Sequence, residues 1–184
     1  MDHDTNMSAP GTTIALRTQT IAHLFSSLDP SPFRQKDLDA GVEEFIVGWV
    51  RELPPTEAFE IVIHMPDSEL AKPDAARVPE AFAHYFTDRA VHAEQDLREL
   101  FRLGRRFLGI GIVALIACLV ASQIAAAAIP NRVVARVLEE SLIIVGWVAN
   151  WRPIEIYLYD WVPIRRRIKL YRRMAAAPIR VRAD

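Results

Sequence analysis

Two apolar stretches in the second half of the chain dominate the pattern of hydrophobic and polar positions. The first, residues 107–129, reads FLGIGIVALIACLVASQIAAAAI, 23 positions without a charged side chain. At about 1.5 Å per residue, a helix of this length covers roughly 34 Å, enough to cross a hydrocarbon core of about 30 Å. Arg105 and Arg106 precede it as a basic flank, and Pro130 and Asn131 follow it as a turn. The pattern therefore predicts a transmembrane helix at 107–129.

The second stretch is interrupted by charge. Arg136, Glu139 and Glu140 lie in its first half, and only residues 141–151 are uncharged, too few to span. Either the span covers 134–151 with its charges near the far interface, or it starts at 141 and continues to 164. We favour 134–151, because Pro153 is a natural helix break or first-turn residue.

The three charged residues of this second stretch are intramembrane polar candidates, since ionisable groups in spans are expensive and often functional. Arg136 and Glu140 are four positions apart and are expected to pair on one helix face. That leaves Glu139 to face water, the other helix or a second subunit. The alternative is that all three form a charged turn at the outer edge of the hairpin.

Upstream, the periodicity predicts a small α+β domain. Helical spacing of apolar residues favours a helix over 13–28, and Asp39 can cap a second helix that carries Val42, Phe45, Ile46 and Trp49 on one side. Residues 59–64, FEIVIH, alternate like a strand. A lone strand needs a partner, either residues 179–182 or the same strand of a second protomer. Residues 65–78 read as a loop.

A long helix is predicted from Pro79, with a buried stripe of Phe82, Phe86, Ala90, Ala93, Leu97 and Leu100. Only Gly104 weakens it, so it is expected to continue into the first span as one rod of about 50 residues.

These elements give a mainly α membrane protein: a small cytoplasmic α+β domain, a long connecting helix, a two-helix transmembrane hairpin and a basic amphipathic C-terminal tail. The predicted segments are a disordered N-terminus (1–12), the domain (13–78), the connecting helix (79–106), the hairpin (107–151) and an interfacial and cytoplasmic tail (152–184).

Charge fixes the expected orientation. The net charge of −1 divides into about −10 for residues 1–97 and about +9 for residues 98–184. Arginines cluster before the first span and after the second, whereas the loop between them holds only Arg132. The positive-inside rule therefore predicts a multi-pass protein of the plasma (inner) membrane with both termini in the cytoplasm.

Small residues form a candidate packing face on the first span. In lipid the hydrophobic effect does not drive helices together, so helices pack closely through small residues. The helix-packing candidates are Gly111, Ala114, Cys118, Ala121, Ser122 and Ala125 of the first span and Gly146 of the second. An alanine-rich helix without a specific partner is the alternative.

The tail segment IRRRIKLYRRM is basic and amphipathic, which is typical of contact with anionic lipid head groups. Its lipid-binding candidates are Arg165, Arg166, Arg167, Lys169, Arg172 and Arg173. A purely topological anchor is the plainer interpretation, and no nucleic-acid partner is expected because the run adjoins the bilayer.

Candidate catalytic chemistry is sparse. His84, Asp88 and His92 recur every four residues and are weak candidates for metal ligands, although a solvated helix face explains them as well. With seven glycines and no recognisable nucleophile or phosphate loop, we expect no cofactor, and the sequence favours a non-catalytic role over an enzyme. The favoured function is an accessory, scaffolding or regulatory membrane protein that binds a protein partner or its own copies. A homo-oligomeric channel or transport-related protein and a metal-dependent membrane enzyme are the alternatives.

Overall fold

The computed structural model describes residues 12–27, 32–33 and 36–184. Of the N-terminal segment 1–12 predicted to be disordered, residues 1–11 lie outside this part of the chain, and Thr12 begins a strand instead. The chain is mostly helical, with one three-stranded sheet. It divides into two compact units, Met1–Val91 with Arg167–Asp184, and His92–Arg166. Each unit is described by itself below.

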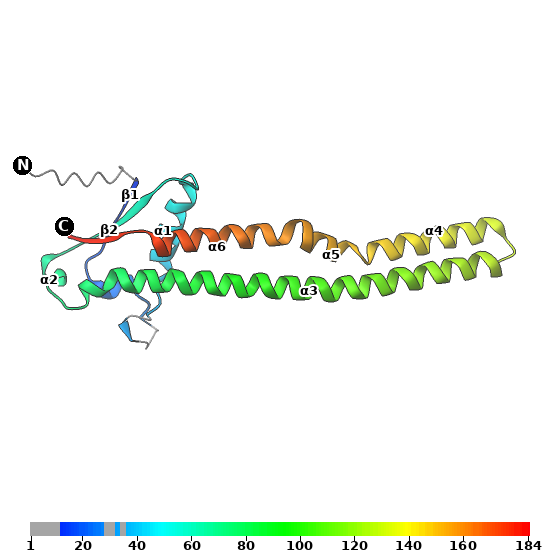
Figure 1. The fold of residues 1–184 in the computed structure, drawn as a ribbon, viewed down its shortest axis with the longest axis horizontal. Coiled ribbons are helices and arrows are strands. Elements are labelled where there is room, and N and C mark those ends of the chain that lie inside the picture. Colours follow the sequence, from blue (N-terminus) through cyan, green and yellow to red (C-terminus); the bar gives the residue numbers. More distant parts are fainter. Residues whose placement is uncertain (1–11, 28–31, 34–35) are drawn as a thin grey trace, which may run out of the picture. The chain divides into compact units, whose positions relative to one another are not determined.

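The sheet of the first unit joins both ends of the chain. Its strands are β1 (Thr12–Arg17), β2 (Phe59–Met65) and β3 (Ile179–Ala183), in the order β1-β2-β3 and all parallel. In the register, Ile14 lies beside Ile61, and Ile61 beside Ile179. Of the two partners left open for the 59–64 strand, the C-terminal residues are the one observed, as β3 (Figure 1).

The predicted helix over 13–28 is wrong. Residues 12–17 form strand β1 instead, and Ile21–Leu24 form a short 3₁₀ helix, while residue 28 lies outside the described residues. Burial of Ile14 and Leu16 between exposed neighbours has the period of two of a strand. Apolar residues after position 17 happen to have helical spacing, which led to the prediction of a helix. Residues 12–17 form a strand because they pair with the edge of β2.

The helix capped by Asp39 is confirmed as α1 (Ala40–Glu52), and the Asp39 carboxylate accepts a hydrogen bond from the Gly41 amide at 2.9 Å. The predicted loop over 65–78 is partly wrong. It contains the single-turn helix α2 (Asp67–Leu70) and a 3₁₀ turn (Ala75–Arg77). The buried Glu69 carboxylate supports this segment by accepting a hydrogen bond from the Ile21 amide.

The core of the first unit lies on the face of the sheet that carries Ile61 and Ile63. Ile46 and Val50 of α1 pack there, together with Phe82 and Phe86 of helix α3 (Val78–Ala128). Helix α6 (Trp161–Ala176) adds Met174, which is fully buried. The basic C-terminal segment therefore ends as part of a folded unit rather than as a free tail.

Helix α3 confirms the predicted rod, since it runs without interruption for 51 residues (Figure 1). Of its predicted buried stripe, Phe82, Phe86, Ala90 and Ala93 are buried, and Leu97 and Leu100 are partly buried.

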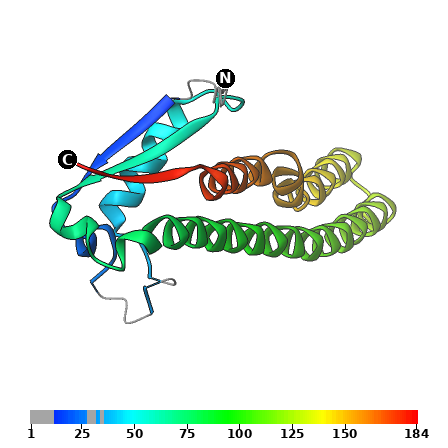
Figure 2. The same ribbon diagram turned by 60° about the vertical axis from the view of Figure 1, so that its left-hand side comes forward.

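In the second unit, α4 (Arg132–Val148) returns alongside α3, as Figures 1 and 2 both show. The Asn131 side chain caps it by accepting from the Val133 and Val134 amides. The helix stops at Ala149 and resumes as α5 (Trp151–Glu155), with Pro153 in the first turn, as expected. A π-helical turn (Ile156–Asp160) then leads into α6.

Candidate functional site

The apolar part of α3 is the candidate functional element. Among the described residues, α3 is the one helix that is long and apolar enough to cross a membrane. Very little of this stretch is covered by the rest of the protein.

Large apolar side chains of the second unit point outward. Ile110, Val113 and Ile124 of α3 are each more than 60% exposed, as are Val133 and Ile144 of α4. Contiguous exposed apolar surface of this kind is rare on soluble monomers and marks contact with lipid or protein.

Small residues lie on the inner side, where α3 and α4 touch. A Cβ atom built on Gly146 would lie 2.9 Å from Cδ1 of Leu115 and 3.2 Å from Cβ of Cys118. A Cβ on Gly111 would lie 2.6 Å from Oδ1 of Asn150. The two backbones therefore approach closely at these two predicted packing positions, and neither position has room for a side chain.

The other predicted packing residues of α3 vary in burial. Ser122 is fully buried, and its hydroxyl donates a hydrogen bond to the Leu119 carbonyl oxygen at 2.8 Å. Cys118 contacts Gly146, as described above. Ala114, Ala121 and Ala125 are partly buried.

Asn150 is a buried polar residue that sequence reasoning missed. Its amide nitrogen Nδ2 donates to the carbonyl oxygens of Gly111 and Gly146, each at 3.0 Å. One side chain thus bonds to both helices where α4 ends. The available signal was a lone asparagine four residues after a glycine in an otherwise apolar run.

The three charged residues of α4 lie in two different environments. Arg136 Nε lies 3.6 Å from Glu140 Oε1, the pair that the spacing predicted, and both side chains are exposed. Glu139 is partly buried instead. It follows buried Ala135 by four residues and precedes buried Gly146 by seven, so it lies on the side of α4 that faces α3.

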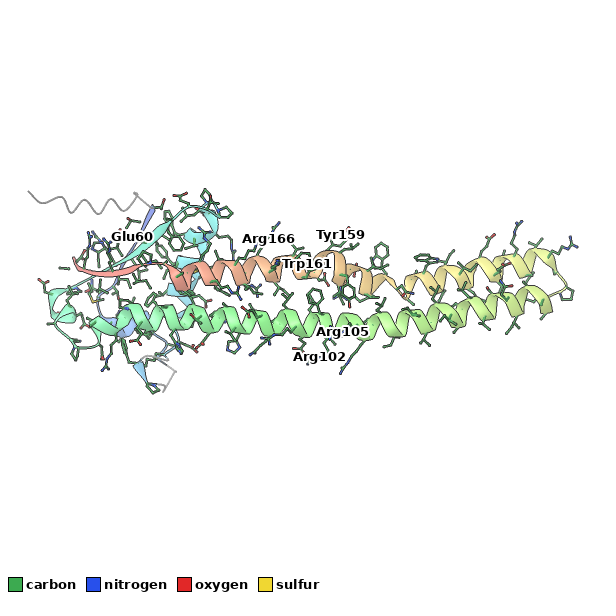
Figure 3. The ribbon with its side chains drawn as sticks, in the orientation of Figure 1. Glu60, Arg102, Arg105, Tyr159, Trp161 and Arg166 are labelled. Atoms are coloured by element: carbon green, nitrogen blue, oxygen red, sulfur yellow. The ribbon has the colours of Figure 1, made fainter. Side chains whose placement is uncertain are left out.

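Aromatic and basic residues gather where the apolar stretch of α3 begins. Phe101 of α3 stacks on Tyr157 of the π-helical turn at 5.9 Å between ring centroids. Arg152 pairs with Glu155 and Asp160 at 3.1 and 3.0 Å. Figure 3 shows other side chains of this region, among them Arg102 and Arg105 of α3, Tyr159 of the π-helical turn and Trp161 at the start of α6. This mixture resembles the interfacial belt of a membrane helix.

The predicted lipid-binding residues of α6 differ in their contacts. Arg165, Arg166, Arg167, Lys169 and Arg172 are exposed. The Arg165 guanidinium lies 5.5 Å from the Trp161 ring centroid. Arg173 instead donates to the carbonyl oxygens of Pro54 and Glu57 and lies over the Phe59 ring. Arg173 is therefore part of the fold of the first unit.

A polar cluster in the first unit joins three helices around Glu43 of α1. The Glu43 carboxylate accepts two short hydrogen bonds of 2.7 Å from Arg89 of α3 and one of 2.8 Å from the Tyr85 hydroxyl. Tyr171 of α6 donates a longer one, and the Arg89 guanidinium lies over the rings of both tyrosines. Burial, followed by the contact with Glu43, raises the pKa of Tyr85 above its ordinary value.

The metal candidates on α3 form a pair rather than a site. His84 Nε2 lies 3.2 Å from Asp88 Oδ2, and both side chains are exposed. Within the described ranges no three His, Cys, Asp or Glu side chains, His92 included, gather closely enough to hold a metal ion.

Comparison with known proteins adds no relative: no family model, characterised protein or solved structure matches the chain.

Proposed function

We propose that this chain is an integral membrane protein whose helices α3 and α4 cross the bilayer together as a hairpin. The observation that carries the proposal is the arrangement of the second unit, with large apolar residues outside and small residues inside. A water-soluble helix pair buries its large apolar residues, whereas a membrane pair packs through small ones and leaves the large ones to lipid.

The sheet of the first unit supports a return crossing. Strand β1 precedes α3 and strand β3 follows α4, yet both pair with β2 in one sheet. If α3 crosses the bilayer, the chain must cross back for β3 to reach β2. Helix α4 has 17 residues, about 26 Å, so it needs part of the following turn or a locally thinner bilayer.

The basic belt supports a cytoplasmic location for the first unit. Arg102, Arg105 and Arg106 precede the apolar stretch of α3. Arg165, Arg166 and Arg167 lie in α6, after α4 has returned. At the opposite end, the loop before α4 is followed by Arg132. The positive-inside rule then places both termini in the cytoplasm.

For its role, we favour an accessory or scaffolding protein that presents the first unit to a partner. Two acidic residues of that unit serve its own fold, since Glu43 binds Arg89 and Tyr85 and Glu69 binds Lys72. An exposed aromatic pair on α1 supports this role: Phe45 and Trp49 are 43% and 49% exposed, with ring centroids 6.3 Å apart. Exposed aromatic pairs are enriched at protein interfaces.

A homo-oligomeric channel is the second candidate, and Glu139 is the observation that favours it. This acid lies on the α3-facing side of α4 and has no hydrogen-bond or ion-pair partner among the described residues. Two helices cannot enclose a pore, so a channel needs several copies.

Cysteine labelling tests the membrane placement. In a Cys118→Ser background, Pro130→Cys marks the loop before α4 and Thr56→Cys marks an exposed position of the first unit. In sealed, right-side-out vesicles an impermeant maleimide is expected to modify residue 130 and to reach residue 56 only after detergent is added. Equal labelling of both positions without detergent contradicts the proposed hairpin.

A further inference from the structure

The contacts between α3 and α4 place Glu140 of α4 away from the loop. Gly146 lies against Leu115 and Cys118, and the two helices run in opposite directions. Moving six residues from Gly146 back to Glu140 therefore corresponds to moving six residues forward along α3, to about the level of Ser122. Helix α3 continues for six more residues, about 9 Å, to Ala128. Glu140 is thus level with the apolar stretch rather than with the loop.

The Arg136–Glu140 pair faces outward, and Arg136 lies one turn nearer the loop than Glu140. Their side chains are 80% and 67% exposed, so α3 does not cover them. In a hairpin surrounded only by lipid, both charges contact hydrocarbon or reach along the helix to the head groups, which is costly for ionisable residues. Such residues usually face protein or a water-filled cavity instead.

The same side of α4 carries an apolar seam. Val133, Val137, Glu140, Ile144 and Trp147 follow one another at alternating spacings of four and three, the spacing of a helix-packing seam. All four apolar members are at least 60% exposed. A single polar position in such a seam is the device that fixes the register and number of packed helices.

We propose that this face of α4 binds the α4 helix of a second copy, so that Arg136 of each copy pairs with Glu140 of the other. The inference rests on the membrane placement proposed above. Two copies inserted in the same orientation and related by a two-fold axis along the bilayer normal present identical faces. Arg136 and Glu140 are one turn apart, about 6 Å, so each arginine reaches the neighbouring glutamate along the paired helices.

Charge complementarity selects a second copy as the occupant. The face carries one negative group, Glu140, within the apolar seam and one positive group, Arg136, beside it, so it is complementary to itself under two-fold symmetry. The dimer satisfies each carboxylate with two guanidinium groups, one from its own chain and one from the other. It also removes both charges and the valines from lipid.

Disulfide cross-linking in native membranes tests the contact. In the full-length Cys118→Ser protein, Val137→Cys lies on the seam, and treatment with copper phenanthroline is expected to give a band of twice the chain mass. Ile124→Cys is the matched control, because it lies at nearly the same level on α3 and is 62% exposed. It is expected to cross-link at least fivefold less.

Charge exchange tests the pairing itself. Arg136→Glu and Glu140→Arg each place like charges in the seam and are expected to reduce the Val137→Cys dimer about fivefold or more. The double variant Arg136→Glu/Glu140→Arg restores opposite charges and is expected to recover the dimer. The neutral pair Arg136→Gln/Glu140→Gln provides a folded reference without repulsion.

Several results overturn the inference. If Val137→Cys cross-links to a protein of different mass, another protein rather than a second copy binds this face. Equal cross-linking of residues 137 and 124 contradicts a specific contact through this face of α4. A double variant Arg136→Glu/Glu140→Arg that stays monomeric contradicts it as well. Far-side labelling of Pro130→Cys combined with a monomeric Val137→Cys protein overturns the dimer alone, whereas loss of far-side labelling overturns the proposed hairpin as well.

Discussion

Asn150 donates a hydrogen bond of 3.0 Å to the carbonyl oxygen of Gly111, a residue 39 positions earlier on the opposite helix. Two features make this contact possible. Gly111 has no side chain to hold the helices apart, and α4 ends just before Asn150. A second bond, to the Gly146 carbonyl oxygen, fixes the same side chain to its own helix.

In the proposed membrane hairpin, replacing Asn150 with leucine is expected to weaken the α3–α4 contact by about 1 kcal/mol, because hydrogen bonds between membrane helices contribute roughly this much. Unfolding in mixed detergent and SDS measures the change. Gln123→Leu is the control, since Gln123 is an exposed polar residue of α3. Equal stability of the Asn150→Leu and wild-type proteins contradicts a stabilising role for the bond.

The glycines of α3 give a matched pair for close packing. A Cβ atom at Gly111 meets Asn150 and the Ala149 carbonyl oxygen at 3.0 Å or less, whereas one at Gly109 meets nothing within 4 Å. Gly109→Ala is expected to be neutral or to stabilise the helix by up to about 1 kcal/mol. Gly111→Ala is expected to lower the unfolding midpoint despite the same gain in helix propensity. If both substitutions have the same effect, the helices are not in tight contact at Gly111.

The cluster around Glu43 predicts a loss of stability at alkaline pH. Burial and the hydrogen bond to Glu43 raise the pKa of Tyr85 above the ordinary value of 10.0, and burial raises that of Tyr171 as well. As the pH rises through about 10, the unfolded chain loses these protons while the folded chain keeps them. Stability is therefore full below pH 10 and falls above it, by up to about 1.4 kcal/mol per pH unit for each tyrosine.

Tyr85→Phe is expected to reduce this slope, because the variant no longer carries the proton at that position. Thermal unfolding of the detergent-solubilised protein between pH 8 and pH 11.5 measures it. Tyr159→Phe, at an exposed tyrosine of the second unit, is the control. A slope unaffected by Tyr85→Phe shows that another group governs the alkaline transition.

The arginines of α6 separate lipid contact from folding. Changing Arg165, Arg166 and Arg167 to glutamine is expected to reduce the enrichment of anionic over neutral lipids around the protein in nanodiscs, since each charge contributes about 1 kcal/mol near the surface. Mass spectrometry of the retained lipids measures the ratio. Arg173→Gln is expected to lower thermal stability instead, because it loses the bonds to Pro54 and Glu57. Unchanged lipid enrichment in the triple variant contradicts lipid contact.

Strong local signals made much of the fold predictable. The uncharged run and the unbroken stripe from Phe82 onward indicated α3, Asp39 indicated the start of α1, and the spacing of Arg136 and Glu140 indicated their pair. These signals depend on the periodicity and capping of single elements, so they can be read without tertiary contacts.

Features that depend on tertiary contacts were missed. Residues 12–17 become a strand because β2 lies beside them, which helical spacing further along the chain obscured. Asn150 is a polar side chain in a short break, and only the approach of Gly111 reveals its bonds. Likewise, the fold of the first unit involves Arg173, whereas its basic sequence neighbours made it look like part of a lipid-binding run.

The long separation of β2 and β3 along the chain has a consequence for biosynthesis. The central strand β2 leaves the ribosome more than 100 residues before its neighbour β3, and the two apolar helices are made in between. The first unit therefore stays incomplete, with one edge of β2 open, until β3 has been synthesised. In the proposed hairpin, β3 reaches β2 only after the chain has crossed the bilayer twice, so completion of the sheet would report successful insertion. A chain in which β3 does not reach β2 keeps an unpaired strand edge. Such an edge promotes aggregation and exposes the chain to quality control.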